Sequence, residues 1–407
     1  MKSIFNYSIK SIILFLFTFF LIIFEIFPIS TYLDEIVAVL SILGLIYIFI
    51  KGNIKKYDKI SLVLLAVFLL IGFFGNLFSG VSRPVMSIFL DAFDNIKVFV
   101  IFYYFYYSFK SVKIRNEFID LAKFPAILFI CVSTVCSLIS IFINIGMSYG
   151  TRFGINAFTF IFEMQHQYTA VCILCLCIVS ISNISFKKFF IILALIPILL
   201  TTKGPSILFV VFFLILMFIF FKKFKFNIWT IIILFILTIL IGSFQIENYL
   251  QNQDAPRYLF FKYAFIDANA HLPFGSGFAT FGSDMAAKYY SPLYIQYGFN
   301  SLYGMSEANN AFLNDTGLPM YIGQCGYIGT AVFLYFYYRI FNLYNKSIKN
   351  YLIKALSLTI LIVFLIHSVG AAILTNSSCV IAFIGLSLLN EKKDFLFLDK
   401  EVLYAKQ

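Results

Sequence analysis

Long apolar runs recur along the whole sequence, and they constrain the fold more than any other feature. A helix that crosses a bilayer needs about 20 mostly apolar residues, because unpaired backbone amides are costly in hydrocarbon. Of the 407 residues, 61% are hydrophobic and 12% are charged, whereas a soluble chain carries about 25% charged residues. The pattern excludes a soluble enzyme with a single anchor. It predicts an all-α polytopic membrane protein, formed as a single integral membrane domain over residues 1–407.

Twelve segments are predicted to span the bilayer as helices. They cover residues 9–27, 35–50, 60–78, 95–109, 121–146, 168–183, 188–201, 205–221, 228–244, 318–338, 353–373 and 378–390. The runs are continuous and do not alternate between polar and apolar residues, which argues against the strands of a β-barrel. Three of the segments, at 35–50, 188–201 and 378–390, are short, so tilted or partly buried helices are expected there.

The distribution of Lys and Arg predicts how these helices are oriented. If the chain begins in the cytoplasm, all but seven of the 30 Lys and Arg residues lie on the cytoplasmic side; the exceptions are Arg83, Lys97, Arg152, Lys203, Arg257, Lys262 and Lys288. This bias is typical of a multi-pass bacterial inner-membrane protein, here with both termini in the cytoplasm. The net charge of +11 then faces anionic lipid headgroups, and no nucleic acid partner is needed to explain it.

This topology leaves one large extracytoplasmic loop at residues 247–317. Asp254 followed by Pro256 is typical of a helix start, with Asp254 as the N-cap residue. Helical spacing of apolar residues then predicts one buried face, formed by Phe261, Ala264, Phe265 and Ala268. A second short helix is predicted at residues 284–290. A long loop in a compact protein usually carries function, so the working surface is expected on the outer side.

The second half of this loop is crowded with aromatic residues. They are Tyr289, Tyr290, Tyr294, Tyr297, Phe299 and Tyr303. Rings with a polar tip are typical of an aromatic belt at the membrane interface. Their flat faces also suit stacking against sugar rings. The sequence leaves both interpretations open.

Arginine is rare in the chain but is concentrated in the predicted outer segments. Three of the five Arg residues, Arg83, Arg152 and Arg257, lie there. Arg binds phosphate through two parallel hydrogen bonds, whereas Lys acts as a point charge. Arg83 and Arg152 could instead pair with nearby carboxylates such as Asp91 or Glu163. For Arg257 an anion site is favoured, because a cation in the first turn of a helix opposes the helix dipole unless an anion also binds there.

Lys203 is a second candidate for binding phosphate. It lies in a turn between two apolar segments, where it could be an interfacial Lys that extends to the headgroups. The alternative is a phosphate-contacting cation at membrane depth, where charges are seldom kept without a use.

Several residues are candidates for acid–base chemistry. The large loop offers Glu307, Asp315 and His271, and the other outer segments add Glu163, His166 and His367. A metal site or other cofactor is not expected, because the chain has three His without a metal-binding spacing. All seven Cys fall in predicted spans, where they act as small apolar side chains.

Three motifs together resemble the Wzy class of polymerases, which join lipid-linked oligosaccharide repeat units of O-antigen or capsule. They resemble O-antigen ligases more distantly. The motifs are the turn LTTKGPS at residues 200–206; Arg257 followed by HLPFGSGF at 271–278; and NNAFL at 309–313 with Asp315, followed by GYIG at 326–329. With the hydropathy pattern, the likeness spans most of the chain. The chain has Lys203 where the family often has Arg, and Asn309 where ligase-like members carry His.

The resemblance implies a GT-C-like fold and an inverting, metal-independent glycosyl transfer at the outer face of the inner membrane. Donor and acceptor would both be undecaprenyl-diphosphate-linked oligosaccharides, and undecaprenyl diphosphate would leave. Arg257, with Lys203 or Arg152, is then expected to bind the diphosphate. Glu307 or Asp315 is expected to orient or deprotonate the acceptor hydroxyl. The remaining expected substrate-binding residues are Arg83, His271, Asn309 and Asn310. Membrane lipids and a chain-length regulator are further candidate partners.

Two other functions remain open. A ligase that moves finished glycan to another acceptor would share the fold and the donor. A flippase or other transporter of lipid-linked oligosaccharide would be expected to carry charged residues within its spans, and the predicted spans are nearly free of charge.

Overall fold

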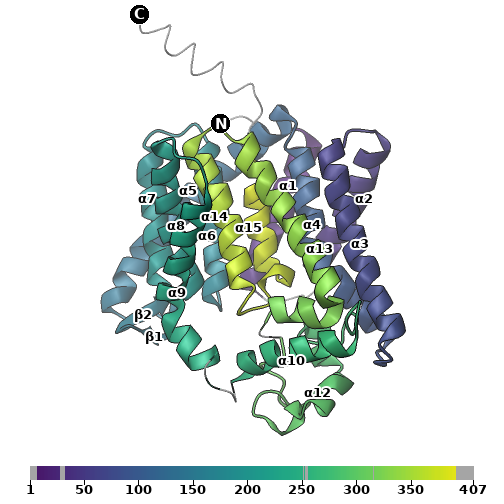
Figure 1. Ribbon diagram of the computed structural model, residues 1–407. Coiled ribbons are helices and arrows are strands. Elements are labelled where there is room, and N and C mark those ends of the chain that lie inside the picture. The colour runs from purple at the N-terminus through teal and green to yellow at the C-terminus, as the bar shows by residue number, and fades with distance from the viewer. Residues whose placement is uncertain (1–6, 28–32, 251, 253–254, 315, 391–407) are drawn as a thin grey trace, which may run out of the picture.

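The computed structural model describes residues 7–27, 33–250, 252, 255–314 and 316–390, which form a bundle of helices with one small sheet (Figure 1). The α-helices are α1 (Ile9–Ile26), α2 (Leu33–Ile50), α3 (Lys56–Phe78), α4 (Val85–Ser108), α5 (Val112–Phe142), α6 (Gln165–Ile181), α7 (Lys187–Leu200), α8 (Gly204–Phe221), α9 (Ile228–Leu250), α10 (Pro256–Ala270), α11 (Asp284–Lys288), α12 (Pro292–Gln296), α13 (Leu318–Ser347), α14 (Tyr351–His367) and α15 (Ser377–Leu388). The strands are β1 (Ser148–Arg152) and β2 (Ile155–Phe158), and short 3₁₀ turns lie at η2 (Phe299–Ser301) and η3 (Ile373–Thr375).

The helices indicate a membrane-embedded protein. Among the described residues, five helices are long and apolar enough to cross a membrane, namely α1, α2, α3, α5 and α8. Shorter apolar helices accompany them at α6, α14, α15 and the first part of α9. Every apolar segment predicted from the sequence overlaps a helix, so the predicted all-helical architecture is confirmed.

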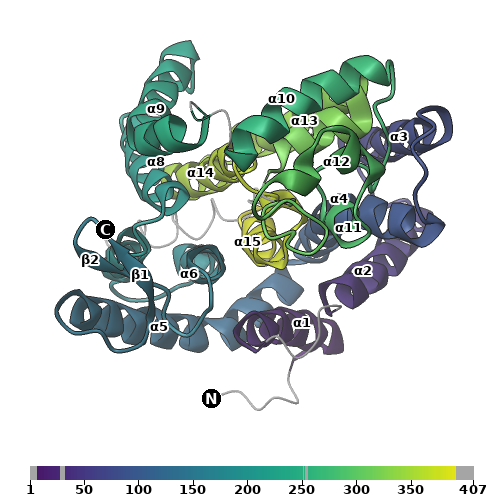
Figure 2. The ribbon, with the colours of Figure 1, turned by 90° about the horizontal axis from the view of Figure 1, so that it is seen from below.

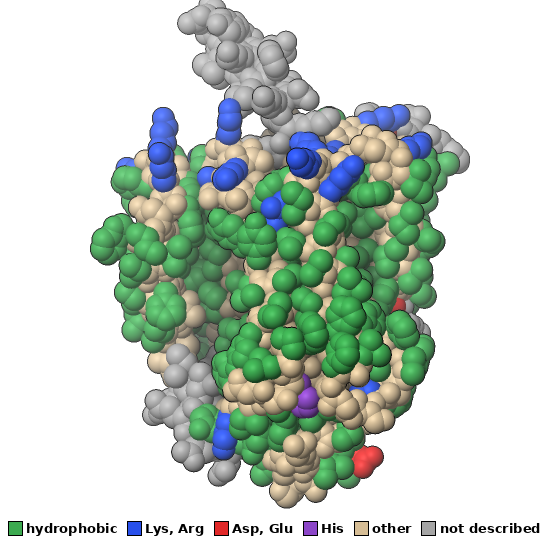
Figure 3. Space-filling view, turned by 45° about the vertical axis from the view of Figure 1, so that its right-hand side comes forward, with side chains coloured by type: hydrophobic (Ala, Val, Ile, Leu, Met, Phe, Trp, Pro, Cys, Tyr) green, Lys and Arg blue, Asp and Glu red, His purple; other side chains and the backbone are tan. Residues whose placement is uncertain are grey.

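The two ends of the bundle differ in charge. Lys and Arg side chains gather at one end, seen at the top of Figure 3, and hydrophobic side chains cover the flank below them. We call this the lysine-rich end. The opposite end, which we call the loop end, carries α10, α11, α12 and the β1–β2 hairpin (Figure 1).

Helix α15 forms the centre of the bundle. It packs against α1, α4, α6 and α14 (Figure 2), and its residues from Ser378 to Leu388 are buried. Its 12 residues rise about 18 Å, which is less than the roughly 30 Å thickness of a hydrocarbon core.

Helix α4 begins ten residues before the predicted span, at Val85. Asp91 and Asp94 precede the predicted span at 95–109, which left them in a loop, but they lie on this helix. Asp91 is 2% exposed, and Lys97 Nζ lies 2.9 Å from Asp94 Oδ1 and 2.7 Å from Asp34 Oδ2 on α2. Hydropathy alone missed this part of α4, because its charged side chains satisfy one another within the bundle.

The segment between α5 and α6 contains a hairpin that the sequence analysis did not predict. Strands β1 and β2 pair antiparallel, with Arg152 opposite Ile155. Phe153 and Gly154 make the tight turn, with φ values of 53° and 78°. With five and four residues, the strands are too short to produce a clear alternating pattern.

Helix α10 matches the predicted first helix of the large loop, with two corrections. Its N-cap residue is Ala255, one residue later than predicted; Asp254 lies outside the described residues. Its buried face consists of Phe260, Ala264, Asp267 and Ala268. Phe265, which was expected to be buried, is 45% exposed. The expected face was drawn through apolar residues alone. The buried face also includes Asp267, whose carboxylate is hydrogen-bonded. The predicted second helix is confirmed as α11.

The 273–282 loop inserts between α3 and α13. Ser276 N donates to Gly323 O at 3.0 Å, and Gly277 N donates to Gln324 O at 2.8 Å. The loop meets α13 where Gly326 interrupts the helix with φ 61° and ψ −170°. The predicted span at 318–338 is therefore two helical pieces, and the second begins at the GYIG motif.

The aromatic residues of the large loop mostly pack against one another. Tyr294 and Phe299 are fully buried, with ring centroids 5.6 Å apart, and Tyr297 stacks on Tyr263 at 4.6 Å. They form the loop's own core rather than a membrane belt or an open sugar platform. Tyr303, at 85% exposure, stays available for either role.

Candidate functional site

The turn between α7 and α8 places Lys203 at the start of α8. Thr202 has a left-handed conformation with φ of 55°, and Lys203 is the N-cap residue before Gly204 and Pro205. Lys203 Nζ lies 3.2 Å from His166 Nδ1 on α6. A protonated Lys only donates hydrogen bonds, so His166 Nδ1 accepts and its Nε2 carries the ring proton. The pair therefore presents an ammonium and an imidazole N–H side by side.

Arg257 lies in the first turn of α10, directly after Pro256. A proline at the first helical position fixes where the helix begins, and α10 packs along α13 and α9. Arg257 and Lys203 line the same cavity, which has a volume of about 1230 Å³. The structure thus brings together two cations that the sequence analysis selected separately.

The cavity has a polar end and an apolar wall. The polar end is formed by His166, Lys203, Arg257, Asp284, Asn314 and His367. The apolar wall is formed by side chains of α9, α13 and α14, among them Ile231, Phe235, Ile239, Leu334, Phe341 and Leu365. The rings of Phe226 and Phe341, with centroids 5.4 Å apart, join α13 to the segment before α9. The wall therefore extends from the polar end toward the lysine-rich end.

Four of the longer described helices begin at this cavity. Residues at the N-termini of α6, α8, α10 and α15 line it, namely Met164, Gly204, Arg257 and Asn376. The first turn of a helix carries amide N–H groups without helical partners and a partial positive charge. Convergent helix N-termini with Lys203 and Arg257 make the polar end suitable for phosphate groups.

The remaining predicted site residues have other positions. Within the described part of the chain, these residues do not line the cavity: Arg83, Arg152, His271, Glu307, Asn309 and Asn310. Asp315 lies outside the described residues. The predicted site is therefore divided between the cavity and its surroundings.

Arg83 binds backbone carbonyls, and not the carboxylates proposed as its alternative partners. Its guanidinium donates to Met285 O at 3.3 Å, Tyr289 O at 3.2 Å and Tyr290 O at 3.4 Å. These carbonyls lie in and just after α11. Arg83 therefore fixes α11 against the start of α4.

His271 belongs to a network around Asp267, which is fully buried. Asp267 accepts hydrogen bonds from Ser276 Oγ at 2.5 Å and Tyr297 Oη at 3.0 Å, and its Oδ1 lies 3.0 Å from His271 Nδ1. The network ties the end of α10 to the 273–282 loop and to the aromatic core. His271 thus has a structural role, and the expectation that it binds substrate has no support in this geometry.

This network predicts a pH dependence of stability. The hydrogen bond to Asp267 raises the pKa of His271 above its ordinary value. Protonated His271 therefore stabilises the folded state. This contribution is complete below the pKa of the unfolded chain, about 6.5, and is lost as the pH rises through the higher pKa of the folded state. The unfolding temperature of the wild type should therefore fall more between about pH 6 and about pH 8 than that of His271→Gln. Equal falls in thermal melts at constant ionic strength would contradict the assignment.

Arg152, Glu307 and the two Asn residues lie on the outer surface. Arg152 is exposed on β1, and Glu307, Asn309 and Asn310 are exposed in the loop before α13. Asn310 Nδ2 donates to Ala287 O at 3.4 Å, which ties this loop to α11. Glu307, just before the NNAFL motif, and Asn309 and Asn310, within it, thus do not reach the cavity.

Asp284 and Asn314 are among the polar residues of the cavity that sequence reasoning missed. Both line it, and Asn314 Nδ2 donates to Asp284 Oδ1. His166 and His367 had been named as acid–base candidates; both line the cavity, and His166 pairs with Lys203 there. In sequence Asp284 follows Ser283 as an ordinary first-turn acid, so no local signal distinguished it.

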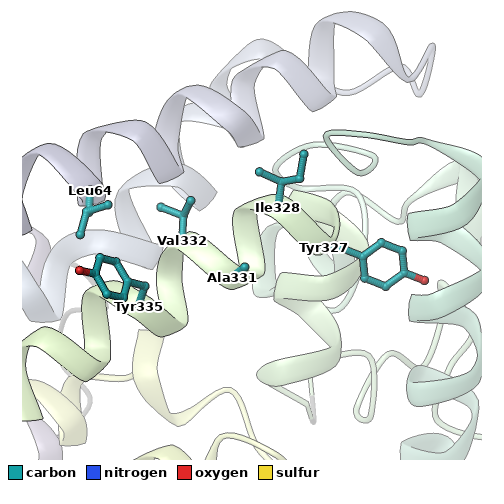
Figure 4. A pocket seen from close by; sticks show the side chains of 6 residues that line it. All are labelled: Leu64, Tyr327, Ile328, Ala331, Val332 and Tyr335. Atoms are coloured by element: carbon teal, nitrogen blue, oxygen red, sulfur yellow. The ribbon is translucent and has the colours of Figure 1, made fainter.

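A second hollow lies on the outside of α13, against α3 (Figure 4). It has a volume of about 410 Å³ and is lined by Leu64, Tyr327, Ile328, Ala331, Val332 and Tyr335. Its lining includes no charged side chain, so it offers a surface for lipid and no means for chemistry. Among the described residues, no group of three His, Cys, Asp or Glu side chains could hold a metal ion.

Comparisons with known proteins give no family. No protein-family model matches the chain, and no curated protein matches it. The chemistry of the cavity is therefore inferred from its own residues.

Proposed function

We propose that this protein polymerises lipid-linked oligosaccharide repeat units into O-antigen or capsular polysaccharide, as the Wzy-class polymerases that its motifs resemble do. The observation that carries the proposal is the cavity. In it Lys203, Arg257 and four helix N-termini lie at one end of a long apolar wall.

The cavity suits an amphipathic ligand with an anionic head. Undecaprenyl diphosphate consists of a diphosphate on a long hydrocarbon chain. The polar end offers cations and amides to the diphosphate, and the wall of α9, α13 and α14 offers apolar surface to the chain. A volume of about 1230 Å³ exceeds the roughly 300–1000 Å³ of ordinary small-molecule pockets.

The proposed topology has twelve membrane-spanning helices in a GT-C-like arrangement, in the bacterial inner membrane. Its support is the charge distribution, with Lys and Arg gathered at one end (Figure 3). Placing the lysine-rich end in the cytoplasm follows the positive-inside rule. The polar end of the cavity then faces the outer leaflet, where lipid-linked sugars are presented, and both termini lie in the cytoplasm.

The proposed reaction is an inverting, metal-independent glycosyl transfer. A sugar hydroxyl of one lipid-linked unit attacks the anomeric carbon of another, and undecaprenyl diphosphate leaves. Negative charge grows on the leaving diphosphate in the transition state. Lys203, Arg257 and the N–H group of His166 are placed to stabilise that charge, and preorganised donors of this kind are usually the largest single contribution to catalysis.

A ligase would use the same donor and therefore fits the same cavity. It differs from a polymerase in the acceptor, which would be a different glycan or lipid. A strain that lacks this chain should carry glycans of one repeat unit if the protein is a polymerase. Long lipid-linked glycan that never reaches its acceptor would identify a ligase.

A transporter is the alternative from another class. The bundle does contain two buried charges, Asp34 and Lys97, and the half-buried Asp94, but these pair with one another and do not line the cavity within the described residues. A transport pathway would need charges along its lumen, whereas the wall of this cavity is apolar.

The direct test uses purified protein in lipid vesicles with a lipid-linked repeat unit added from outside. We expect a ladder of products longer than one unit and release of undecaprenyl diphosphate in equal number to the bonds formed. Lys262→Ala removes an exposed cation of the same helix as Arg257 and should leave the ladder unchanged. Movement of intact substrate across the vesicle without any new glycosidic bond would replace the proposal by a transporter.

A further inference from the structure

We infer that Asp284 is the general base that accepts the proton of the attacking sugar hydroxyl. The inference rests on the proposed glycosyl transfer and assigns a residue to a step for which the sequence suggested Glu307 or Asp315. The inference is drawn from a comparison of which carboxylates line the cavity.

Asp284 is the one residue with a carboxylate among the described residues that line the cavity. It shares this lining with Lys203 and Arg257, so it faces the same space as the proposed diphosphate site. Asp284 and Glu307 are both exposed, but Glu307 lies outside the lining. A general base must reach the proton that it removes, so position decides between the two carboxylates.

The carboxylate of Asp284 is oriented by a neighbour. Asn314 Nδ2 donates to Asp284 Oδ1, and Asn314 also lines the cavity. Asp284 Oδ2 accepts no hydrogen bond from the part of the chain that the structure describes. One oxygen is therefore held while the other is available to a substrate hydroxyl, which is the arrangement of a base and an orienting group.

The backbone around Asp284 is fixed on both sides. Ser283 caps α11 through its hydroxyl, which accepts from Ala286 N at 3.2 Å. On the other side, Arg83 Nη2 donates to Met285 O at 3.3 Å. Because α11 also packs against α4, the carboxylate is presented by a short helix anchored to the bundle. Arg83 is thus a positioning residue for Asp284, and its place outside the cavity is consistent with that role.

The step balances without any further reactant. The hydroxyl oxygen of the acceptor forms a bond to the anomeric carbon, and its proton passes to Asp284 Oδ2. The bond from the anomeric carbon to the diphosphate oxygen breaks, and its electron pair leaves with the diphosphate. Lys203 and Arg257 stabilise that leaving charge, and Asp284 returns its proton to water afterwards.

The experiment compares wild type, Asp284→Asn, Asp284→Glu and Glu307→Gln as purified proteins in lipid vesicles. Undecaprenyl diphosphate is the binding probe, and a lipid-linked repeat unit is the substrate for turnover. We expect Asp284→Asn, which keeps the shape and the hydrogen bond to Asn314, to bind the probe like wild type. Its kcat should fall by about 100-fold or more, the usual size of general-base catalysis. Glu307→Gln should retain wild-type kcat.

Two further readouts separate a base from a purely structural residue. In Asp284→Asn the loss should fall on kcat, with KM close to that of wild type. Asp284→Glu should recover part of kcat. A kcat for Asp284→Asn within about threefold of wild type would overturn the inference, since loss of a general base lowers the rate by a much larger factor. Parallel loss of probe binding and of thermal stability would also overturn it, in favour of a structural role.

The failure of this inference can be told from failure of the proposed function. If wild type lengthens the glycan and Asp284→Asn does so equally well, only the base is misassigned. If wild type forms no glycosidic bond under any condition, the glycosyl transfer is wrong and the role of Asp284 is overturned with it.

Discussion

Replacing Arg257 by Ala should reduce glycan polymerisation by about 100-fold or more, which is the usual cost of removing one preorganised donor from a transition-state charge. Arg257 lies in the first turn of α10 and lines the cavity together with Lys203. Its guanidinium can bind two phosphate oxygens at once, and among the described residues no other Arg lines the cavity. In cells, the expected phenotype is surface glycan of one repeat unit.

Arg257→Lys should give an intermediate loss. It keeps the charge but loses the planar fork, so diphosphate binding should survive better than turnover. Lys262→Ala is the matched control, because it removes a cation from the exposed side of the same helix. The amounts of the three variant proteins in the membrane must be equal to that of wild type. If Arg257→Ala then produced surface glycan of wild-type length, Arg257 would not be part of the site.

The cations of the site were predictable from the sequence because they are unusual where they occur. Arg257 is one of few Arg residues in a Lys-rich chain, and Lys203 interrupts two apolar segments. Each signal is local and needs no knowledge of the fold. The cavity that joins them was not predictable, since it depends on how α8, α10, α13 and α14 pack.

The missed residues show what local signals leave out. Asp284 looks like an ordinary first-turn acid, and the role proposed for it follows only from the cavity that α11 adjoins. Asp91 and Asp94 were placed in a loop because hydropathy penalises charge, although hydrogen bonds and ion pairs accommodate both on α4. Glu307 was selected as an acidic residue of the large loop, which says little about its position in the folded loop.

The 273–282 loop is the part of the fold where one substitution should have the largest effect on stability. Gly275 has φ of 79°, and a Cβ there would lie 2.4 Å from Gly326 N and 2.6 Å from Gly323 O. Both contacts are with backbone, so no side chain can move aside. Gly275→Ala therefore combines backbone strain of about 1–3 kcal/mol with a clash that only separation of the loop from α13 can relieve.

The matched control is Gly298→Ala, at a glycine with φ of 74° and no atom within 4 Å of an added Cβ. It imposes similar backbone strain without the clash. Gly275→Ala should therefore unfold at a clearly lower temperature than Gly298→Ala in the same detergent. Because the loop joins the end of α10 to the interruption in α13, its displacement should also misplace Arg257 and reduce diphosphate binding. Equal unfolding temperatures for the two variants would show that α10 is held against α13 by other contacts.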